Sequence, residues 1–128
     1  MRRVLLVVLS VALLWSGPAL AAGLQVAQGV VTTQVVNRMP VDEIQSYTVS
    51  VGKLYCFTRI VGAQGDTTVT DVWKLNGQEV ARVELPVRSS DWRTWSSKTI
   101  PPEAKGEWEV DVLDAQGQLL KTIKFTLK

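Results

Sequence analysis

From residue 23 onward, hydrophobic and polar positions alternate with a period of two in short runs, each bounded by Gly, Pro, Asn or Asp. No stretch of twelve or more residues there has the 3.6-residue apolar period of an amphipathic helix. The pattern is typical of half-buried strands and predicts seven or eight of them. The predicted strands cover Gln25 to Val36, Tyr47 to Val51, Leu54 to Ile60, Thr67 to Leu75, Glu79 to Val87, Arg93 to Ile100, Gly106 to Leu113 and Leu119 to Leu127.

Turn residues and side-chain alternation indicate how these strands fold together. Asn76-Gly77 is a strong signal for a two-residue hairpin turn, and the segment 114–118 connects the last two strands. Along the strand from Gly106, apolar and acidic side chains alternate, which predicts one buried and one wet face. The predicted inward residues of the last two strands are Trp108, Val110, Val112, Ile123, Phe125 and Leu127.

Short strands joined by turns every ten or so residues favour an all-β fold, a single immunoglobulin-like or fibronectin-like antiparallel β-sandwich over residues 22–128. Trp73 is placed where such sandwiches often carry a core tryptophan. A lipocalin-type barrel is the alternative, although about 107 residues are few for eight strands that enclose a ligand cavity.

The first 21 residues have the pattern of a cleaved secretory signal peptide. Arg2 and Arg3 form a positive start, Val4 to Trp15 form an uncharged apolar run, and Ala19-Leu20-Ala21 matches a cleavage site. The apolar run is too short to cross a bilayer, which needs about 20 residues. We therefore expect a periplasmic or secreted protein without stable membrane insertion after cleavage.

Charge and composition exclude several classes of function. The net charge of +2 comes from Arg2 and Arg3, so the expected mature chain is neutral and has no electrostatic preference for nucleic acid. The sequence has no histidine and one cysteine, Cys56, so it cannot form a Cys/His zinc site, a Ser-His-Asp triad or an internal disulfide. No cofactor is expected.

The segment from Ser89 to Lys98 carries two tryptophans three positions apart. In an extended strand Trp92 and Trp95 point to opposite sides, so at least one indole is expected to be available at the surface. The basic residues Arg88, Arg93 and Lys98 flank them, and a cation over an indole is common both in ligand binding and in simple structural stacking. Trp92, Arg93, Trp95 and Lys98 are therefore candidate binding residues.

Two further residues stand out for their expected burial. Asp71 alternates with apolar neighbours, so its carboxylate is predicted to face the core, paired with Arg93, Arg59 or Lys98. It is either a fold-stabilising ion pair or a fifth candidate binding residue. Cys56 is predicted to be a small buried thiol, with an intermolecular disulfide as the alternative.

Other acidic residues are interpreted without a catalytic or metal role. Glu107, Glu109 and Asp111 resemble a glycosidase carboxylate cluster, but on a wet strand face they are expected to be surface charge. Asp66 and Asp114 lie in turns that lack the regularly spaced oxygen ligands of a calcium loop. No metal is assigned.

Four segments, taken together, resemble a known family: Gly52 to Thr58, Val72-Trp73, Trp92 to Lys98, and Gly106 to Val110. Their order and spacing are similar to the bacterial domain-of-unknown-function family numbered 2914, over about Val26 to Leu127. The resemblance implies a small extracytoplasmic β-domain, often at the end of a longer chain, and implies no activity. The family pattern has a histidine where this chain has Asp71, which puts in doubt any function that needs that imidazole.

Three classes of function remain. A binding or interaction module of the cell envelope, with a glycan or an envelope protein as partner, is favoured over a purely structural envelope domain. A carboxylate-dependent hydrolase is disfavoured, since no nucleophile has a plausible base beside it. We therefore expect no enzyme activity, no nucleic-acid partner and a monomer.

Overall fold

The computed structural model describes residues 23–128, and the predicted signal segment Met1 to Ala21 lies outside them. Ten strands and one short 3-10 helix form within the described residues. Seven strands contain eight or more residues: β1 (Gln25–Thr32), β5 (Lys53–Val61), β6 (Thr67–Leu75), β7 (Gln78–Val87), β8 (Asp91–Thr99), β9 (Gly106–Leu113) and β10 (Leu119–Leu127). Three strands have two residues each: β2 (Val35–Val36), β3 (Met39–Pro40) and β4 (Ser46–Tyr47). No helix in this part of the chain has the length and apolar character needed to cross a bilayer.

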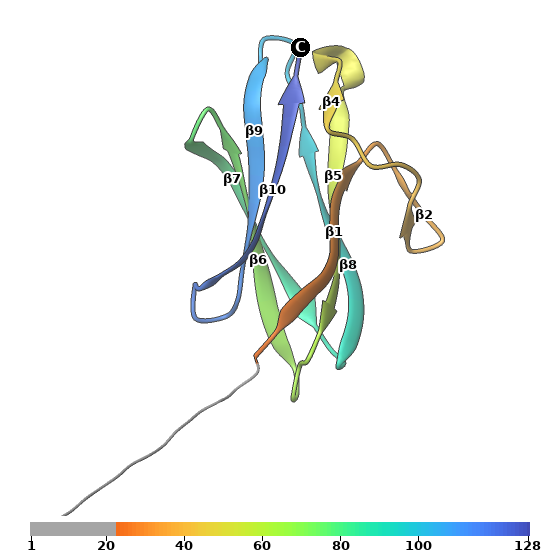
Figure 1. Cartoon of the computed structure of the whole chain (residues 1–128), viewed down its shortest axis with the longest axis vertical. Coiled ribbons are helices and arrows are strands. Elements are labelled where there is room, and N and C mark those ends of the chain that lie inside the picture. Colours follow the sequence, from red (N-terminus) through yellow and green to blue (C-terminus); the bar gives the residue numbers. More distant parts are fainter. Residues whose placement is uncertain (1–22) are drawn as a thin grey trace, which may run out of the picture.

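The long strands form two facing sheets (Figure 1). One sheet has the order β1-β5-β8 and the other has the order β4-β10-β9-β6-β7, while β2 and β3 form a separate hairpin. The chain changes sheet between β5 and β6, and β8 returns to pair with β5. This arrangement confirms the predicted all-β sandwich with seven main strands. The strands form two separate sheets, whereas the alternative barrel would have a single closed sheet.

Three details of the predicted strands were wrong. The expected strand Gln25 to Val36 ends at Thr32, because the hydroxyls of Thr32 and Thr33 donate to the Asp42 carboxylate, both at 2.6 Å, and turn the chain. The expected strand Tyr47 to Val51 is a 3-10 helix, η1 (Val49–Val51), whose cap is the Thr48 side chain. The sandwich is also not wholly antiparallel, since β4 pairs with β10 in parallel.

The core lies between the two sheets and is built around aromatic rings. Trp73 and Trp108 both pack on Phe125, the first edge-on at 6.4 Å between ring centroids and the second stacked at 5.8 Å. Such pairs contribute about 0.5–1.5 kcal/mol each beyond the burial of their surface. Trp108 also donates its indole N–H to the carbonyl of Ala104 at 2.9 Å. The predicted inward faces of β6, β9 and β10 are thus confirmed.

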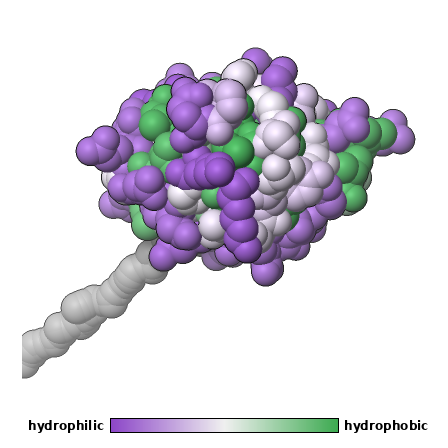
Figure 2. All heavy atoms as spheres, turned by 90° about the horizontal axis from the view of Figure 1, so that it is seen from above, coloured by the Kyte–Doolittle hydropathy of each residue, from purple (hydrophilic) through white to green (hydrophobic). Residues whose placement is uncertain are grey.

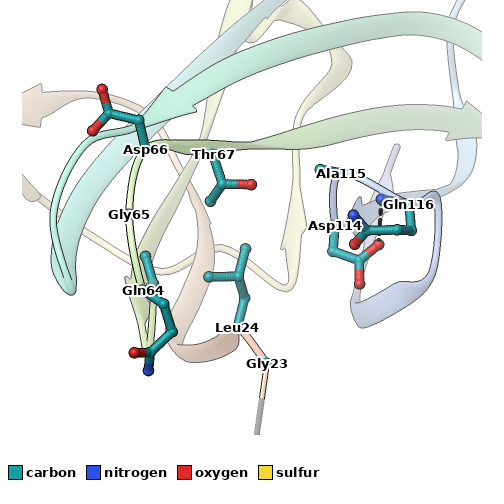
Figure 3. A pocket seen from close by; sticks show the side chains of 11 residues that line it. Gly23, Leu24, Gln64, Gly65, Asp66, Thr67, Asp114, Ala115 and Gln116 are labelled. Atoms are coloured by element: carbon teal, nitrogen blue, oxygen red, sulfur yellow. Dashed lines mark hydrogen bonds between the residues drawn. The ribbon is translucent and has the colours of Figure 1, made fainter. Parts of the chain in front are cut away.

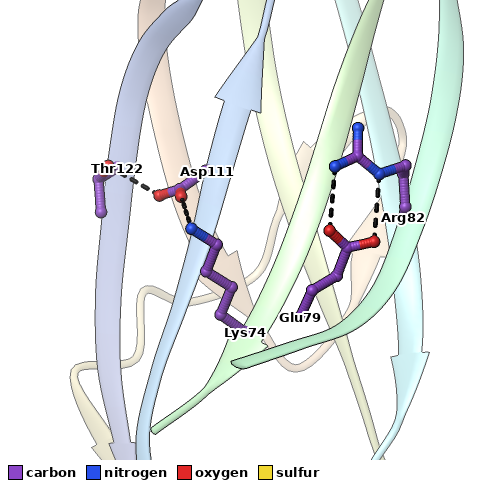
Figure 4. A network of polar contacts seen from close by, with 5 residues as sticks. All are labelled: Lys74, Glu79, Arg82, Asp111 and Thr122. Carbon is purple, nitrogen blue, oxygen red and sulfur yellow. Dashed lines mark hydrogen bonds and ion pairs between the residues drawn. The ribbon is translucent and has the colours of Figure 1, made fainter. Parts of the chain in front are cut away.

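The outer face of the five-stranded sheet carries a polar network (Figure 4). Lys74 forms an ion pair with Asp111 at 2.8 Å, and the Thr122 hydroxyl donates to the same carboxylate at 2.8 Å. Burial alone would raise the pKa of Asp111, but Lys74 and Thr122 hold it below its ordinary value. Asp111 is only 7% exposed, so the expectation that it is ordinary surface charge was wrong: its partners bury it.

The predicted hairpin turn at Asn76-Gly77 is confirmed between β6 and β7. Both residues have positive φ, 50° and 84°, as a type I′ turn requires. The Asn76 side chain also accepts the backbone N–H of Glu107 at 3.0 Å, which ties the turn to β9.

Candidate functional site

A second two-residue hairpin turn joins β2 to β3, and its central residues are Asn37 and Arg38. Both have positive φ, 52° and 61°. Asparagine visits this left-handed region readily, whereas a residue such as arginine is disfavoured there by roughly 1–2 kcal/mol. This turn was not predicted from the sequence, because Asn-Arg is not a hairpin signature.

Arg38 extends from this strained position to the edge of β8. Its guanidinium carbon lies 5.7 Å from the ring centroid of Trp92 and 5.7 Å from that of Trp95. Its Nη2 atom also donates to the backbone carbonyl of Arg93 at 3.2 Å. Because β8 is an edge strand of its sheet, Arg38 occupies a position that a neighbouring strand would otherwise take.

The two tryptophans lie on opposite sides of β8, as predicted. Trp92 is in register with Ile60 and packs against the core, whereas Trp95 is in register with Phe57 on the outer side. The rings of Trp95 and Phe57 are stacked, with 6.4 Å between centroids and 19° between planes. Both indoles are half-buried, so each has one part in the fold and one part at the surface.

The cation beside the indoles is not one of those expected. Arg88, Arg93 and Lys98 are near in sequence, but Arg38 contacts both rings and comes from a hairpin more than fifty residues earlier in the chain. Tertiary packing brings it there, and no local pattern in the sequence could have found it. Arg88 is exposed in the connection between β7 and β8.

A group of charged residues adjoins the indoles. Arg59 lies opposite Arg93 in register and holds both carboxylate oxygens of Asp91, at 2.9 and 2.7 Å. This contact lowers the pKa of Asp91. Within residues 23–128 the Arg93 side chain forms no ion pair. A hollow of about 290 Å³ lies between Arg38, Asp91 and Arg93.

Exposed apolar residues on the hairpin complete this region. Val36, Met39 and Val41 are 44%, 43% and 51% exposed. In Figure 1 the hairpin projects on the outer side of the three-stranded sheet, and Figure 2 shows hydrophobic and hydrophilic residues together on that projection. We call this region the hairpin–β8 surface, which comprises Val36, Arg38, Met39, Val41, Trp92, Arg93 and Trp95.

The other two candidate binding residues lie elsewhere. Lys98 lies three residues beyond Trp95 and six beyond Trp92 on β8, about 10 and 20 Å away in an extended strand. Its ammonium donates to the Thr99 carbonyl at 2.8 Å. Asp71 lies on β6 in the opposite sheet and is fully buried. The structure therefore brings together Trp92, Arg93 and Trp95, and separates Lys98 and Asp71 from them.

The burial of Asp71 was predicted, but its expected basic partner was wrong. Its Oδ2 accepts a hydrogen bond from the Ser96 hydroxyl at 2.6 Å, and Ser96 in turn accepts the indole N–H of Trp73 at 3.1 Å. The three candidate cations point elsewhere: Arg59 binds Asp91, Lys98 binds Thr99, and Arg93 is on the outer face of β8. Oδ1 of Asp71 has no hydrogen-bond partner among the described residues.

Burial raises the pKa of Asp71 to about 6, and the hydrogen bond from Ser96 offsets part of that effect. Cys56 lies opposite Ser96 in register and is fully buried, as predicted. Burial, and secondarily the charge of Asp71, raises the pKa of the Cys56 thiol well above its ordinary value. A buried, protonated thiol is a poor nucleophile, so this group offers no accessible chemistry.

A hollow of about 310 Å³ lies where the start of β1 meets the turns at 62–66 and 114–116 (Figure 3). The carboxylates of Asp66 and Asp114 lie on opposite sides of it. One oxygen of Asp114 accepts the backbone N–H groups of Gln116 and Gln118, both at 2.9 Å, so this side chain holds its own turn. In the described part of the chain, no group of three acidic, His or Cys side chains is placed to hold a metal ion.

The chain also resembles a known family in sequence. A model of the family described as "Protein of unknown function (DUF2914)" matches residues 66–127. Over this segment the chain is similar to the DUF2914 family. The DUF2914 segment contains β6 to β10 and so includes Trp92, Arg93 and Trp95, whereas the hairpin with Arg38 precedes it. The match begins forty residues later than the resemblance expected from Val26. No curated protein matches the chain.

Proposed function

We propose that this protein is a non-catalytic interaction module that works outside the cytoplasm and binds a protein partner through the hairpin–β8 surface. The observation that carries the proposal is the placement of Arg38. The backbone of Arg38 has a disfavoured positive φ. Its guanidinium group lies over two half-buried indoles of the edge strand β8. Strain of this kind is concentrated at functional sites.

The composition of the surface supports a binding role. Tryptophan, arginine and methionine are enriched at protein interfaces, and tryptophan and arginine dominate the residues whose loss most weakens binding. Here Arg38 contacts Trp92 and Trp95, and the exposed Met39 follows Arg38 in the same hairpin. Exposed apolar side chains grouped on one projection are costly for a protein that has no partner.

A protein partner fits the geometry better than a glycan. Sugar rings stack on bare aromatic faces, but Arg38 lies over both indoles and Phe57 stacks on Trp95. Arg38 and Phe57 therefore occupy ring faces on which a sugar would stack. The guanidinium groups and the apolar hairpin are the accessible features, and both suit a protein surface.

Export is the second part of the proposal and rests on the signal-like segment Met1 to Ala21. We expect the exported protein to begin at Ala22. Intact-mass measurement of the extracytoplasmic fraction tests this. A species that retains Arg2 and Arg3 would contradict export by cleavage.

The binding role is tested by capture of partners from native cell extracts. The protein, expressed from its full sequence, is immobilised as wild type, Trp95→Ala and Arg82→Ala. Arg82 is an exposed arginine of the other sheet, ion-paired with Glu79, and serves as the matched control. We expect a protein that the wild type and Arg82→Ala retain and Trp95→Ala loses. If Trp95→Ala stays folded and retains the same proteins, this surface does not bind them. A purely structural role is then the better explanation.

A further inference from the structure

The charges around the hollow on the hairpin–β8 surface do not balance. Three guanidinium groups, those of Arg38, Arg59 and Arg93, adjoin a single carboxylate, Asp91. Arg59 occupies both oxygens of that carboxylate. Asp91 lines the hollow together with Arg38 and Arg93, but its carboxylate is already paired with Arg59, so positive charge predominates around the hollow.

The two arginines that line the hollow keep free donors. Arg38 uses one N–H group for the Arg93 carbonyl, and a guanidinium has five. The Arg93 side chain has no ion pair among residues 23–128. Guanidinium forks match the geometry of a carboxylate, and such charge-assisted hydrogen bonds are about twice as strong as neutral ones.

The indoles hold Arg38 in place before a ligand arrives. The contacts with Trp92 and Trp95 and the hydrogen bond to Arg93 fix the direction of a long, flexible side chain. Less ordering entropy is then lost when this side chain binds a ligand. The strained turn at Arg38 is consistent with this arrangement.

We propose that the hollow between Arg38 and Arg93 receives the carboxylate of an Asp or Glu side chain on the protein partner. The inference rests on the proposed function and names the chemistry that the partner must present. The hollow is lined by charged side chains, whereas small-molecule pockets are mostly apolar, so it suits a charged side chain presented by a protein. Val36 and Met39 pair at the base of the turn that carries Arg38 and are exposed, which favours an acidic residue flanked by apolar ones over a free anion.

The test uses defined probes. One is a short capped peptide with a single glutamate between leucines, and its matched control replaces the glutamate by glutamine. Inorganic phosphate is the free-anion probe. Binding is followed by the indole N–H resonances in two-dimensional NMR, because Trp92 and Trp95 contact Arg38. We expect the glutamate peptide to bind at least tenfold more tightly than the glutamine peptide, and its binding to weaken with added salt.

Variants then assign the effect to the hollow. Arg93→Ala and Arg38→Ala should each lower affinity for the glutamate peptide at least tenfold, while Arg82→Ala should leave it unchanged. Equal affinity for the two peptides would overturn the inference, and so would shifts from phosphate as large as those from the glutamate peptide. If Trp95→Ala abolishes partner capture and Arg93→Ala does not, the carboxylate inference fails and the binding role stands. If neither variant changes capture, the proposed function itself fails.

Discussion

The hydroxyl of Ser96 lies 2.6 Å from Oδ2 of Asp71, and through this hydrogen bond a strand of one sheet holds a buried carboxylate of the other. Ser96 lies on β8, one residue after Trp95, so the strand carries Trp95 of the candidate surface on its outer side and the carboxylate contact on its inner side. Trp73 donates to the same hydroxyl and completes the bridge between the sheets.

Asp71→Asn should stabilise the protein at pH 8. The folded-state pKa of Asp71 is raised to about 6 from an ordinary value of 3.8, so the fold favours the protonated form. This difference in pKa corresponds to about 3 kcal/mol in the free energy of unfolding. The stabilisation from the bound proton is complete below about pH 4 and is lost as the pH rises through 6. Chemical denaturation between pH 4 and 8 measures the effect.

The comparison between the variant and the wild type isolates Asp71 from the other acidic groups. Asp42, Asp91 and Asp111 have lowered pKa values and give the opposite slope below about pH 4 in both proteins. The advantage of Asp71→Asn should therefore shrink as the pH falls from 6 to 4. An advantage that is constant with pH would show that Asp71 does not titrate in this range.

Ser96→Ala should destabilise the protein by about 2–4 kcal/mol at pH 8, because it leaves the buried Trp73 N–H and the Asp71 carboxylate without partners. The loss should be smaller at pH 5, where Asp71 is protonated. Ser97→Ala, an exposed neighbour on the same strand, is the control and should change stability by less than about 0.5 kcal/mol. Equal losses for both serines would contradict the bridge.

The thiol of Cys56 should not react with a disulfide reagent in the native protein. It is fully buried between the sheets, and its raised pKa disfavours the reactive thiolate. Complete reaction is expected only in denaturant. A disulfide-linked dimer on a non-reducing gel of native protein would show that β5 opens, and would favour the intermolecular alternative.

Periodicity predicted most of the sandwich because alternation directly reports which side of a strand is buried. The inward positions of β6, β9 and β10 follow this rule, from Trp73 to Phe125. The strand at Tyr47 to Val51 was wrong because the capping hydroxyl of Thr48 decides that segment. Such local hydrogen bonds compete with the ladder of a sheet and leave no period in the sequence.

The candidate site could be predicted only in part. Alternation placed Trp92 and Trp95 on opposite sides of β8, and it placed Asp71 in the core. The contact with Arg38 depends on a hairpin that crosses to another strand, and the Ser96 bridge depends on how the two sheets face each other. Both are long-range relationships, which a single sequence does not encode in its local pattern.

Arg38→Gly separates a folding role of this arginine from a binding role. The chain uses Asn76-Gly77 in one hairpin turn and Asn37-Arg38 in the other, both with positive φ, so it contains its own comparison. Glycine should relieve the strain of roughly 1–2 kcal/mol and lose contacts of similar size, the cation–π pair and one hydrogen bond. We expect a net change in unfolding free energy within about 1 kcal/mol, together with loss of partner capture. If the free energy of unfolding of the variant instead falls by more than about 2 kcal/mol, Arg38 serves chiefly to cover the edge of β8. The structural role then becomes the better explanation of this surface.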